Sequence, residues 1–326
     1  MVVLAIGVTP DTALAKEAGL ELGIKGSIVV NDRMETSVPD IYAAGDAVQV
    51  KHYVTGDDAL ISLAGPANKQ GRIIADNICG GDSRYLGSQG SSVIKVFDMT
   101  AATTGINETN AKKSGLDVDT VILSPMSHAG YYPGGKVMTM KVVFEKETYR
   151  LLGAQIIGYE GVDKRIDVLA TAIHAGLKAT QLKDLDLAYA PPYSSAKDPV
   201  NMAGFMIDNI AKGTLKQWHL EDMDKISKDK SVVLLDVRTV GEFNRGHMDG
   251  FRNIPVDELR ERINEIEKGK PVYLICQSGL RSYIASRILE GNGYETYNFS
   301  GGFRFYDAVV NDRALIERAY ACGMDY

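Results

Sequence analysis

The chain has 326 residues, of which 45% are hydrophobic and 24% charged, and its formal net charge is −6. This composition is typical of a globular protein of two or three domains, and it gives no reason to expect nucleic acid or an anionic membrane as partner. No apolar run is long enough to span a bilayer, and the start lacks the cationic region of a signal peptide. Three widely spaced cysteines, Cys79, Cys276 and Cys322, match neither a disulfide framework nor a zinc site. We therefore expect a cytoplasmic protein without a metal site.

The first ninety residues predict an α/β unit. Residues 2–8 (VVLAIGV) predict a buried strand, and residues 9–19 a short helix capped by its first residue. Two short strands are expected within residues 26–47, followed by an amphipathic helix over residues 57–81 that ends at a glycine pair. The small, polar segment 86–92 (LGSQGSS) predicts a domain boundary.

Residues 91–213 predict an α+β domain. Two strand-like runs, 136–144 and 150–158, are joined by a polar turn and indicate a hairpin. Within residues 162–182 the apolar side chains fall on one helical face. A second helix is expected over residues 199–213.

Residues 218–326 alternate short buried strands with helical stretches, which is typical of a parallel sheet covered by helices. The expected strands are 232–237, 271–276 and 296–301, and the expected helices are 256–269 and 282–293.

The segment CQSGLR (276–281) places Cys276 between a strand and a helix, outside the carboxyl edge of the predicted sheet, where ligands collect. Backbone N–H groups of the loop that turn inward, the helix N-terminus and the Arg281 guanidinium each favour the thiolate over the thiol. Ser278 and Gly279 are candidate catalytic residues together with Cys276 and Arg281. Gly279 allows the loop to close tightly. The order of these residues predicts a nucleophilic cysteine; the alternative is a buried, inert one.

Arginine is the fifth residue after Cys276, and the sixth, Ser282, is not basic. Phosphatase loops place the arginine one residue later, in a wider ring that fits phosphate. The segment LLDVRTVGEFNRGHMDGFRNIP (234–255), together with CQSGLRS, resembles the rhodanese family. This resemblance implies that Cys276 accepts a sulfane sulfur and passes it to a thiol or cyanide. We expect structural roles, as ion-pair partners or loop anchors, for Asp236, Arg238, Glu242 and His247.

A second motif, TSVPDIYAAGDA (36–47), resembles the second flavin motif of the pyridine nucleotide-disulfide oxidoreductases. At Gly45 the missing side chain lets the ribityl chain of FAD approach, and Asp46 can accept hydrogen bonds from its hydroxyls. The resemblance thus implies an FAD site that includes Thr36, Gly45, Asp46 and Ala47.

The segments HAGYYPGGKVMTMKVVF (128–144) and AYAPPYSSAKDPVNMAG (188–204) resemble the dimerisation domain of coenzyme A-disulfide reductases. The combination of this domain with a rhodanese domain resembles the coenzyme A-disulfide reductase–rhodanese group, which includes NADH-dependent persulfide reductases. The resemblance implies a homodimer through residues 91–213, with two tyrosines reaching the active site of the partner subunit.

The resemblance also implies roles for individual residues. The candidate tyrosines are Tyr189 and Tyr131, with Tyr193 and Tyr132 as open alternatives. Lys197 is expected to bind coenzyme A, because an ammonium suits its phosphates, and Asn68 is expected near the same pocket.

Two family features are absent from the sequence: the G-x-G-x-x-G fingerprints for flavin and nicotinamide, and the S-F-x-N-C segment with the redox cysteine. The resemblance therefore implies a fragment of a longer NADH-dependent protein, in which residues 1–90 are the carboxyl-terminal remnant of the nicotinamide and FAD-binding domains. We expect its FAD site to be incomplete and weakly binding, and its rhodanese domain to be complete. Small sulfur donors and thiol acceptors are the expected partners. Two alternatives remain: a dimerisation scaffold with a non-catalytic rhodanese-like module, and arsenate or phosphatase-type chemistry at the cysteine loop.

Overall fold

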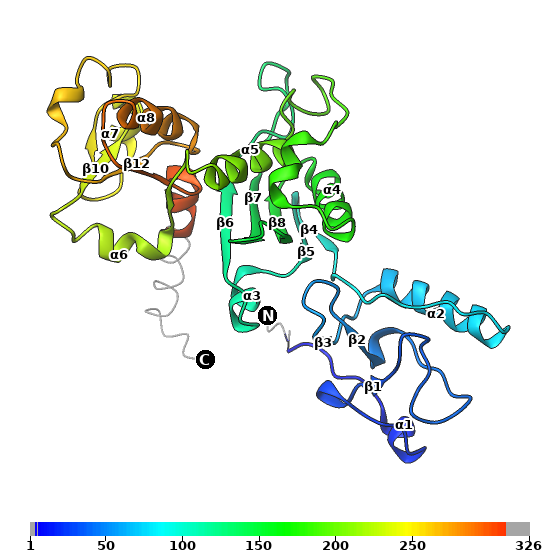
Figure 1. Cartoon of the computed structure of the whole chain (residues 1–326). Helices are drawn as coiled ribbons and strands as arrows, with labels where there is room; N and C mark the ends of the chain where they lie inside the picture. Colours follow the sequence, from blue (N-terminus) through cyan, green and yellow to red (C-terminus); the bar gives the residue numbers. More distant parts are fainter. Residues whose placement is uncertain (1–3, 5, 311–326) are drawn as a thin grey trace.

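We describe a computed structural model of the chain, in which residues 4 and 6–310 are placed. This part of the chain forms three sheets with strand orders β1-β2-β3, β4-β5-β8-β7-β6 and β11-β10-β12-β13-β9. Figure 1 shows the three units side by side in chain order, with the middle one in the centre. The multidomain α/β and α+β class expected from the sequence is confirmed.

The amino-terminal unit is the smallest. Strand β1 pairs with β2 in parallel and β2 with β3 in antiparallel fashion. Helix α2 buries only Gln70 and Asn77 along its length, so most of its surface faces outward. The elements are α1 (Ala13–Glu17), β1 (Ile28–Val29), β2 (Val48–Lys51), β3 (Asp58–Ala59) and α2 (Ala64–Ile78).

Two predictions for this unit are wrong. The expected strand at residues 2–8 does not form in its described part, where Leu4, Ile6 and Val8 are 76–84% exposed. No described strand pairs with it, and an unpaired strand has no ladder to stabilise it. The first helix begins at Ala13 rather than directly after residue 9, and the side chain of Thr12, which precedes it, makes no capping hydrogen bond.

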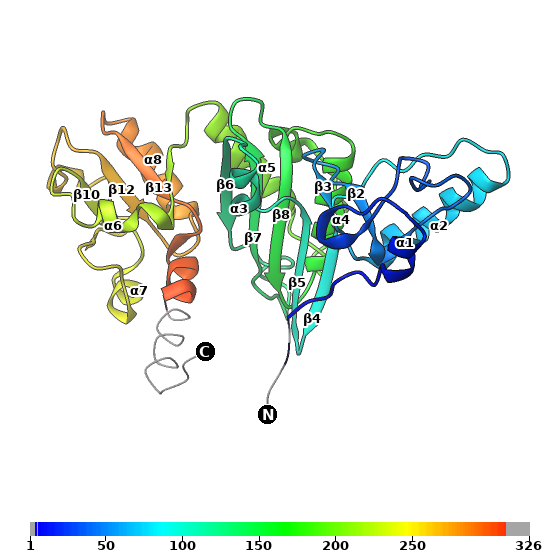
Figure 2. The ribbon, with the colours of Figure 1, turned by 90° about the horizontal axis from the view of Figure 1, so that it is seen from below.

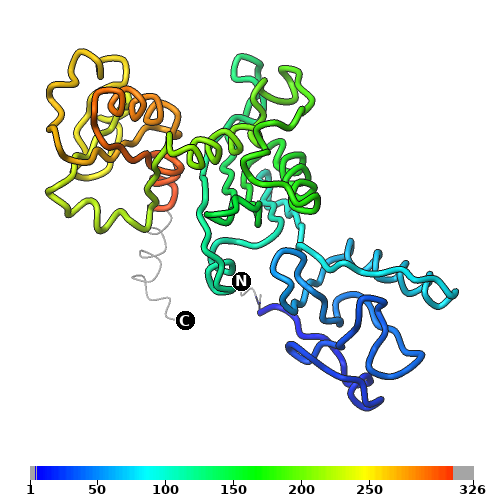
Figure 3. The backbone as a smooth tube through the Cα atoms, viewed as in Figure 1, coloured from blue at the N-terminus to red at the C-terminus, as the bar shows by residue number. Residues whose placement is uncertain are grey.

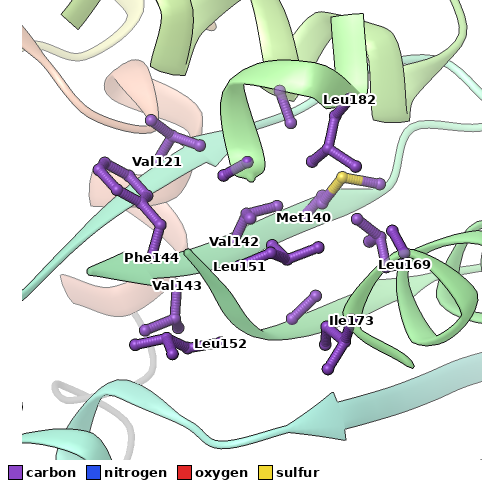
Figure 4. Close-up of a cluster of buried hydrophobic side chains, with 14 of the residues drawn as sticks. Val121, Met140, Val142, Val143, Phe144, Leu151, Leu152, Leu169, Ile173 and Leu182 are labelled. Atoms are coloured by element: carbon purple, nitrogen blue, oxygen red, sulfur yellow. The ribbon is translucent and has the colours of Figure 1, made fainter. Parts of the chain in front are cut away.

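The middle domain packs helices against one face of a five-stranded antiparallel sheet (Figure 2). The predicted hairpin is confirmed as β7 and β8, and the predicted apolar stripe is confirmed on α4, which buries Leu169 and Ile173 against sheet residues such as Val142 (Figure 4). The elements are β4 (Ser92–Val96), β5 (Met99–Gly105), α3 (Glu108–Lys113), β6 (Val118–Leu123), β7 (Thr139–Glu145), β8 (Leu151–Gly158), α4 (Val162–His174) and α5 (Pro199–Ala211).

The carboxyl-terminal domain is a five-stranded sheet in which every pairing is parallel, as predicted. A helix beginning at residue 302 completes its described part. The other elements are β9 (Gln217–Trp218), α6 (Met223–Ile226), β10 (Val233–Asp236), α7 (Val240–Arg245), β11 (Arg252–Asn253), β12 (Val272–Ile275), α8 (Leu280–Glu290) and β13 (Thr296–Phe299).

The helix predicted for residues 256–269 does not form; the segment contains turns and a single 3₁₀ turn at Ile263–Glu265. Side chains from elsewhere in the domain donate hydrogen bonds to the carbonyl groups of this segment. The Tyr294 hydroxyl lies 3.1 Å from the carbonyl oxygens of Ile263 and Ile266, and Arg252 donates to that of Glu265. Tertiary contacts therefore replace the helical hydrogen bonds that the local pattern favours.

The middle and carboxyl-terminal domains are joined by polar contacts around strand β9. Gln217 donates to the Asp119 carboxylate and to the Thr120 carbonyl, at 3.1 and 2.8 Å. His219 Nε2 lies 2.9 Å from Asp119 Oδ1, and the Ile122 N–H donates to Ser300 Oγ in a buried contact of 3.1 Å. Figure 3 shows the chain passing from α5 directly into this junction.

Candidate functional site

Cys276 follows β12 directly, at the carboxyl edge of the parallel sheet, and is 1% exposed. Its Sγ accepts hydrogen bonds from the Gly279 N–H at 3.1 Å and from the Ser282 hydroxyl at 3.2 Å. Gly279 caps α8 with φ of +97°, a conformation that favours glycine. The sulfur therefore lies in a short ring of donors at a helix N-terminus, which favours an anion there.

The cysteine loop is also held from the chain segment that follows β13. The N–H groups of Phe303 and Arg304 donate to the carbonyls of Cys276 and Gln277, at 2.8 and 3.1 Å. At Gly302, with φ of +68°, a Cβ would lie 2.7 Å from the Gln277 oxygen and the Ser278 nitrogen. Backbone can approach this closely only without a side chain. Sequence reasoning missed this contact, although the glycine pair in SGGF was a signal.

Arg281 faces Glu242 of α7 in a two-point ion pair with both N···O distances at 2.7 Å. Glu242 also accepts from the N–H and hydroxyl of Thr239, the residue that caps α7. Hydrogen bonds from Arg281 are the main cause that lowers the pKa of Glu242 to about 2. The guanidinium is thus held in place beside the cysteine loop by a carboxylate that is ionised at neutral pH.

The contacts of Asp236, Arg238 and His247 agree with the structural roles expected of these residues. Asp236 and Arg238 form a buried ion pair at 2.6 Å, and Arg238 lies 3.8 Å from the centroid of the Phe303 ring. His247 stacks on Phe243 at 4.0 Å. Arg238, which follows β10, therefore contacts Phe303, and the N–H of Phe303 in turn donates to the carbonyl of Cys276.

On its other side the loop borders a cavity of about 540 Å³ between the middle and carboxyl-terminal domains, which we call the junction cavity. Ser278 and Gly279 form part of its wall, and Lys197 lies on its opposite, middle-domain side. Asn298 of β13 also lines it and donates to the Gly279 carbonyl at 3.1 Å. Sequence reasoning missed Asn298, because nothing local in TYNFSG marks it.

The two candidate tyrosines meet although 58 residues separate them in the sequence. The hydroxyls of Tyr131 and Tyr189 are 2.8 Å apart, and both rings are exposed. This hydrogen bond is the main cause that raises the pKa of Tyr189 above its usual value. Of the alternatives, Tyr132 packs edge-on against His128, and Tyr193 is 72% exposed.

The predicted flavin residues lie on the turn that precedes β2. Gly45 has φ of +83°, and its N–H donates to Gln70 of α2 at 2.7 Å. Asp46 is exposed in the 3₁₀ turn Gly45–Ala47, and Thr36 closes a neighbouring turn through contacts with Val38. Gly45, which has no side chain, and the exposed carboxylate of Asp46 beside it fit the ribityl part of FAD. No G-x-G-x-x-G fingerprint for the pyrophosphate occurs in the 326 residues.

The structure does not bring Asn68 and Lys197 together within one chain. Asn68 lies on α2, where its side chain donates to the Ala64 carbonyl. Lys197 is at the junction cavity, and α2 and α8 lie on opposite sides of the middle domain (Figures 1 and 2). Among residues 4 and 6–310, no helix could cross a membrane, and no cluster of three or more acidic, histidine or cysteine residues could hold a metal ion.

Three family models match this chain. The pyridine nucleotide-disulphide oxidoreductase model matches residues 1–71, the dimerisation domain of the same oxidoreductases matches residues 91–199, and the rhodanese-like domain matches residues 219–308. The chain therefore belongs to the pyridine nucleotide-disulfide oxidoreductases and carries a carboxyl-terminal rhodanese-like domain. This combination is also found in a solved structure with a closely similar fold, reduced Bacillus anthracis CoADR-RHD, with 48% identity and a TM-score of 0.93.

That structure is matched over 96% of this chain and 56% of its own. A NAD-dependent persulfide reductase from A. fulgidus matches at 42% identity and a TM-score of 0.84, over 92% of this chain and 55% of its own. Among curated relatives, the NAD(P)H sulfur oxidoreductase (CoA-dependent) of Pyrococcus abyssi is 40% identical over 61% of this chain, and the coenzyme A disulfide reductase of Staphylococcus aureus is 37% identical over 63%. These alignments cover 45% and 47% of the relatives, so the chain spans about half their length.

Proposed function

We propose that this chain performs sulfur transfer through a persulfide on Cys276, within a protein that reduces coenzyme A disulfide, persulfides or polysulfides. The donor ring around Sγ carries the proposal: the Gly279 N–H and the Ser282 hydroxyl both point at the sulfur. A ring built to hold one anionic sulfur supports a thiolate in the resting state and a persulfide after the donor has reacted.

The short spacing from Cys276 to Arg281 supports sulfur rather than phosphate chemistry. The Arg281 guanidinium is engaged at two points by Glu242, so it is less free to bind a tetrahedral oxyanion. It contributes positive potential at the edge of the loop. This favours sulfur transfer over the arsenate or phosphatase alternative.

The reductive half of the activity is proposed for the longer protein. FAD, when bound, supplies hydride acceptance from NADH and electron delivery to a disulfide. In this chain Thr36, Gly45, Asp46 and Ala47 would hold its ribityl part. In a homodimer through residues 91–213, the hydrogen-bonded hydroxyls of Tyr131 and Tyr189 would stabilise a sulfur anion in the partner's site.

Coenzyme A binding is likewise proposed for the dimer. Lys197 offers an exposed ammonium for its phosphates. Because Asn68 lies on the far side of the middle domain, a site that used both residues would take them from different subunits.

Thiocyanate production from thiosulfate and cyanide tests the sulfur-transfer step. We expect the purified chain to be active and Cys276→Ser to be inactive. Cys79→Ser is the matched control, because Cys79 is exposed at the end of α2, away from the loop. Absence of thiocyanate with both proteins would instead support a non-catalytic scaffold, and equal activity of the two would show that Cys276 does not carry the sulfur.

A further inference from the structure

The Tyr131–Tyr189 pair is carried by two loops of the middle domain, which we call the tyrosine loops. The first, residues 124–138, joins β6 to β7, and the second, residues 185–198, precedes α5. Figure 1 shows both at the same end of the middle domain. The two rings are 76% and 46% exposed, so the backbone of the loops, rather than burial of the rings, sets where the hydroxyls lie.

Arg165, a residue of α4 that is 1% exposed, donates hydrogen bonds to both tyrosine loops. Its Nη2 lies 3.0 Å from the Ser127 carbonyl oxygen of the first loop. The same nitrogen lies 3.2 Å from Ser194 Oγ and 3.4 Å from the Tyr193 carbonyl oxygen of the second loop. The loops also bond to each other, since the Ala129 N–H donates to the Ser194 carbonyl at 3.0 Å. One buried guanidinium therefore lies where the two loops meet.

The Arg165 guanidinium is itself held in one orientation. Asp198 Oδ2 accepts from its Nε at 3.2 Å and from its Nη2 at 3.0 Å, and the Gly161 carbonyl accepts from its Nη1 at 3.2 Å. A Cβ at Gly161 would collide with Nη1, so the missing side chain leaves room for the guanidinium. A planar group with several donors in fixed directions can bind separate segments at once, whereas a lysine offers a single nitrogen.

Buried ion pairs often add little to stability compared with apolar residues of similar volume, but they can fix one arrangement of the chain. We propose that Arg165 is a positioning residue for the Tyr131–Tyr189 pair, and that it holds the tyrosine loops at the separation at which the two hydroxyls meet. The inference rests on the proposed role of this pair towards a sulfur anion and names the residue that sets its geometry. Arg165 acts through the loop carbonyls and the Ser194 hydroxyl.

The hydrogen bond of 2.8 Å makes the two phenols one unit. One hydroxyl donates to the other, and the second keeps its own proton for an anion; hydrogen bonds in such a chain strengthen one another. If the loops separate, the phenols become two independent groups. Tyr189 then loses the hydrogen bond from Tyr131 that is the main cause of its raised pKa. Ring separation and titration therefore both report on the position of the loops.

Formation of dityrosine in the whole chain measures the separation of the two rings. A light pulse with ruthenium tris-bipyridyl and persulfate joins tyrosine rings that are in contact, and peptide mass spectrometry identifies the Tyr131–Tyr189 cross-link. Arg165→Lys keeps the charge opposite Asp198 but has one nitrogen for both loops, so we expect its yield to fall about fivefold. Ser194→Ala keeps the ion pair and removes one loop contact, and its yield should fall about twofold.

Leu169→Ala is the matched control for a general loss of stability. Leu169 is 0% exposed on the core side of the same helix, so its truncation weakens the packing of α4 without removing a hydrogen bond to either loop. Its yield should equal that of the wild type. Circular dichroism checks the fold of each variant, and Ser194→Ala decides if Arg165→Lys does not fold. Wild-type yields in the folded variants, or equal losses in Leu169→Ala, would overturn the proposal.

Titration of protein labelled with ¹³C at tyrosine Cζ, followed by NMR, gives a second readout. The pKa of Tyr189 should lie above its usual value in the wild type and in Leu169→Ala, and should return towards that value in Arg165→Lys. Tyr189→Phe assigns the resonance. Neither readout involves sulfur. An unchanged cross-link and titration in Arg165→Lys would overturn the positioning role alone, whereas absence of thiocyanate with the wild type contradicts the sulfur-transfer function itself.

Discussion

Arg281 and Glu242 form a two-point ion pair that ties the first turn of α8 to α7, 39 residues earlier in the chain. The guanidinium thereby has a fixed position beside the cysteine loop. Without its carboxylate partner Arg281 would be free to reorient, and the positive potential at the loop would be less well placed.

We therefore expect Glu242→Gln to lower kcat/KM for thiosulfate about three- to tenfold, because one of the charges that positions Arg281 is lost. Steady-state thiocyanate formation measures the effect. Glu261→Gln is the control, since Glu261 is exposed on the surface of the same domain. A variant as active as the wild type would show that the ion pair does not position the loop.

The same pair predicts a pH dependence of stability. The pKa of Glu242 is lowered from 4.5 to about 2, so its contribution is complete above about pH 4.5 and is lost as the pH falls through 2. At pH 6 wild type should exceed Glu242→Gln by about 1 kcal/mol in free energy of unfolding. Urea unfolding followed by fluorescence of Trp218, the one tryptophan in the sequence, reports on this domain. The difference should be constant from pH 7 to 5 and shrink towards pH 3; a difference that is already lost at pH 5 would contradict the assignment.

Gly302 predicts a steric effect on the cysteine loop. In Gly302→Ala the new Cβ would meet the Gln277 oxygen at 2.7 Å, so the backbone at this contact must shift, and we expect the shift to disturb the donors around Sγ. We expect a loss of at least tenfold in sulfur-transfer kcat.

The control separates this contact from backbone strain. Gly293 has φ of +80°, similar to the +68° of Gly302, but a Cβ there meets nothing within 4 Å. Gly293→Ala should therefore lose stability without a comparable loss of kcat. Equal losses of kcat in the two variants would indicate strain rather than contact with the loop.

The middle domain contains a buried ion pair whose loss should be costly. Arg165, 1% exposed, donates to Asp198 Oδ2 at 3.0 and 3.2 Å, and Ser194 donates to the same oxygen. Asp198→Asn leaves the guanidinium without its counter-charge, and we expect a destabilisation of about 3 kcal/mol. Thermal unfolding followed by circular dichroism measures it. Asp163→Asn, at an exposed position of α4, should change stability by less than about 0.5 kcal/mol.

Local sequence patterns were sufficient to predict the features that depend on residues close together in the sequence. The strand–cysteine–loop–helix order around Cys276, the β7–β8 hairpin and the apolar stripe of α4 were all predictable, because each is encoded within about twenty residues. The order of the domains along the chain was inferred from the family resemblance.

Features that depend on topology could not be predicted. Gly302 and Asn298 reach the cysteine loop only because β13 lies beside β12 in the sheet. The helix expected at 256–269 fails because its carbonyls are bonded by distant side chains such as Tyr294. A helical period in the sequence does not reveal such competing partners.

The contacts of β9 limit how the rhodanese-like domain can move. Because this strand is part of the carboxyl-terminal sheet while Gln217 and His219 bind Asp119 of the middle domain, no slack chain separates the two domains. Cys276 therefore stays at a set span from the Tyr131–Tyr189 pair of its own subunit. In the proposed sulfur transfer, sulfur that leaves the loop would cross that span on a small molecule, because the contacts of β9 hold the domain that carries the cysteine in place.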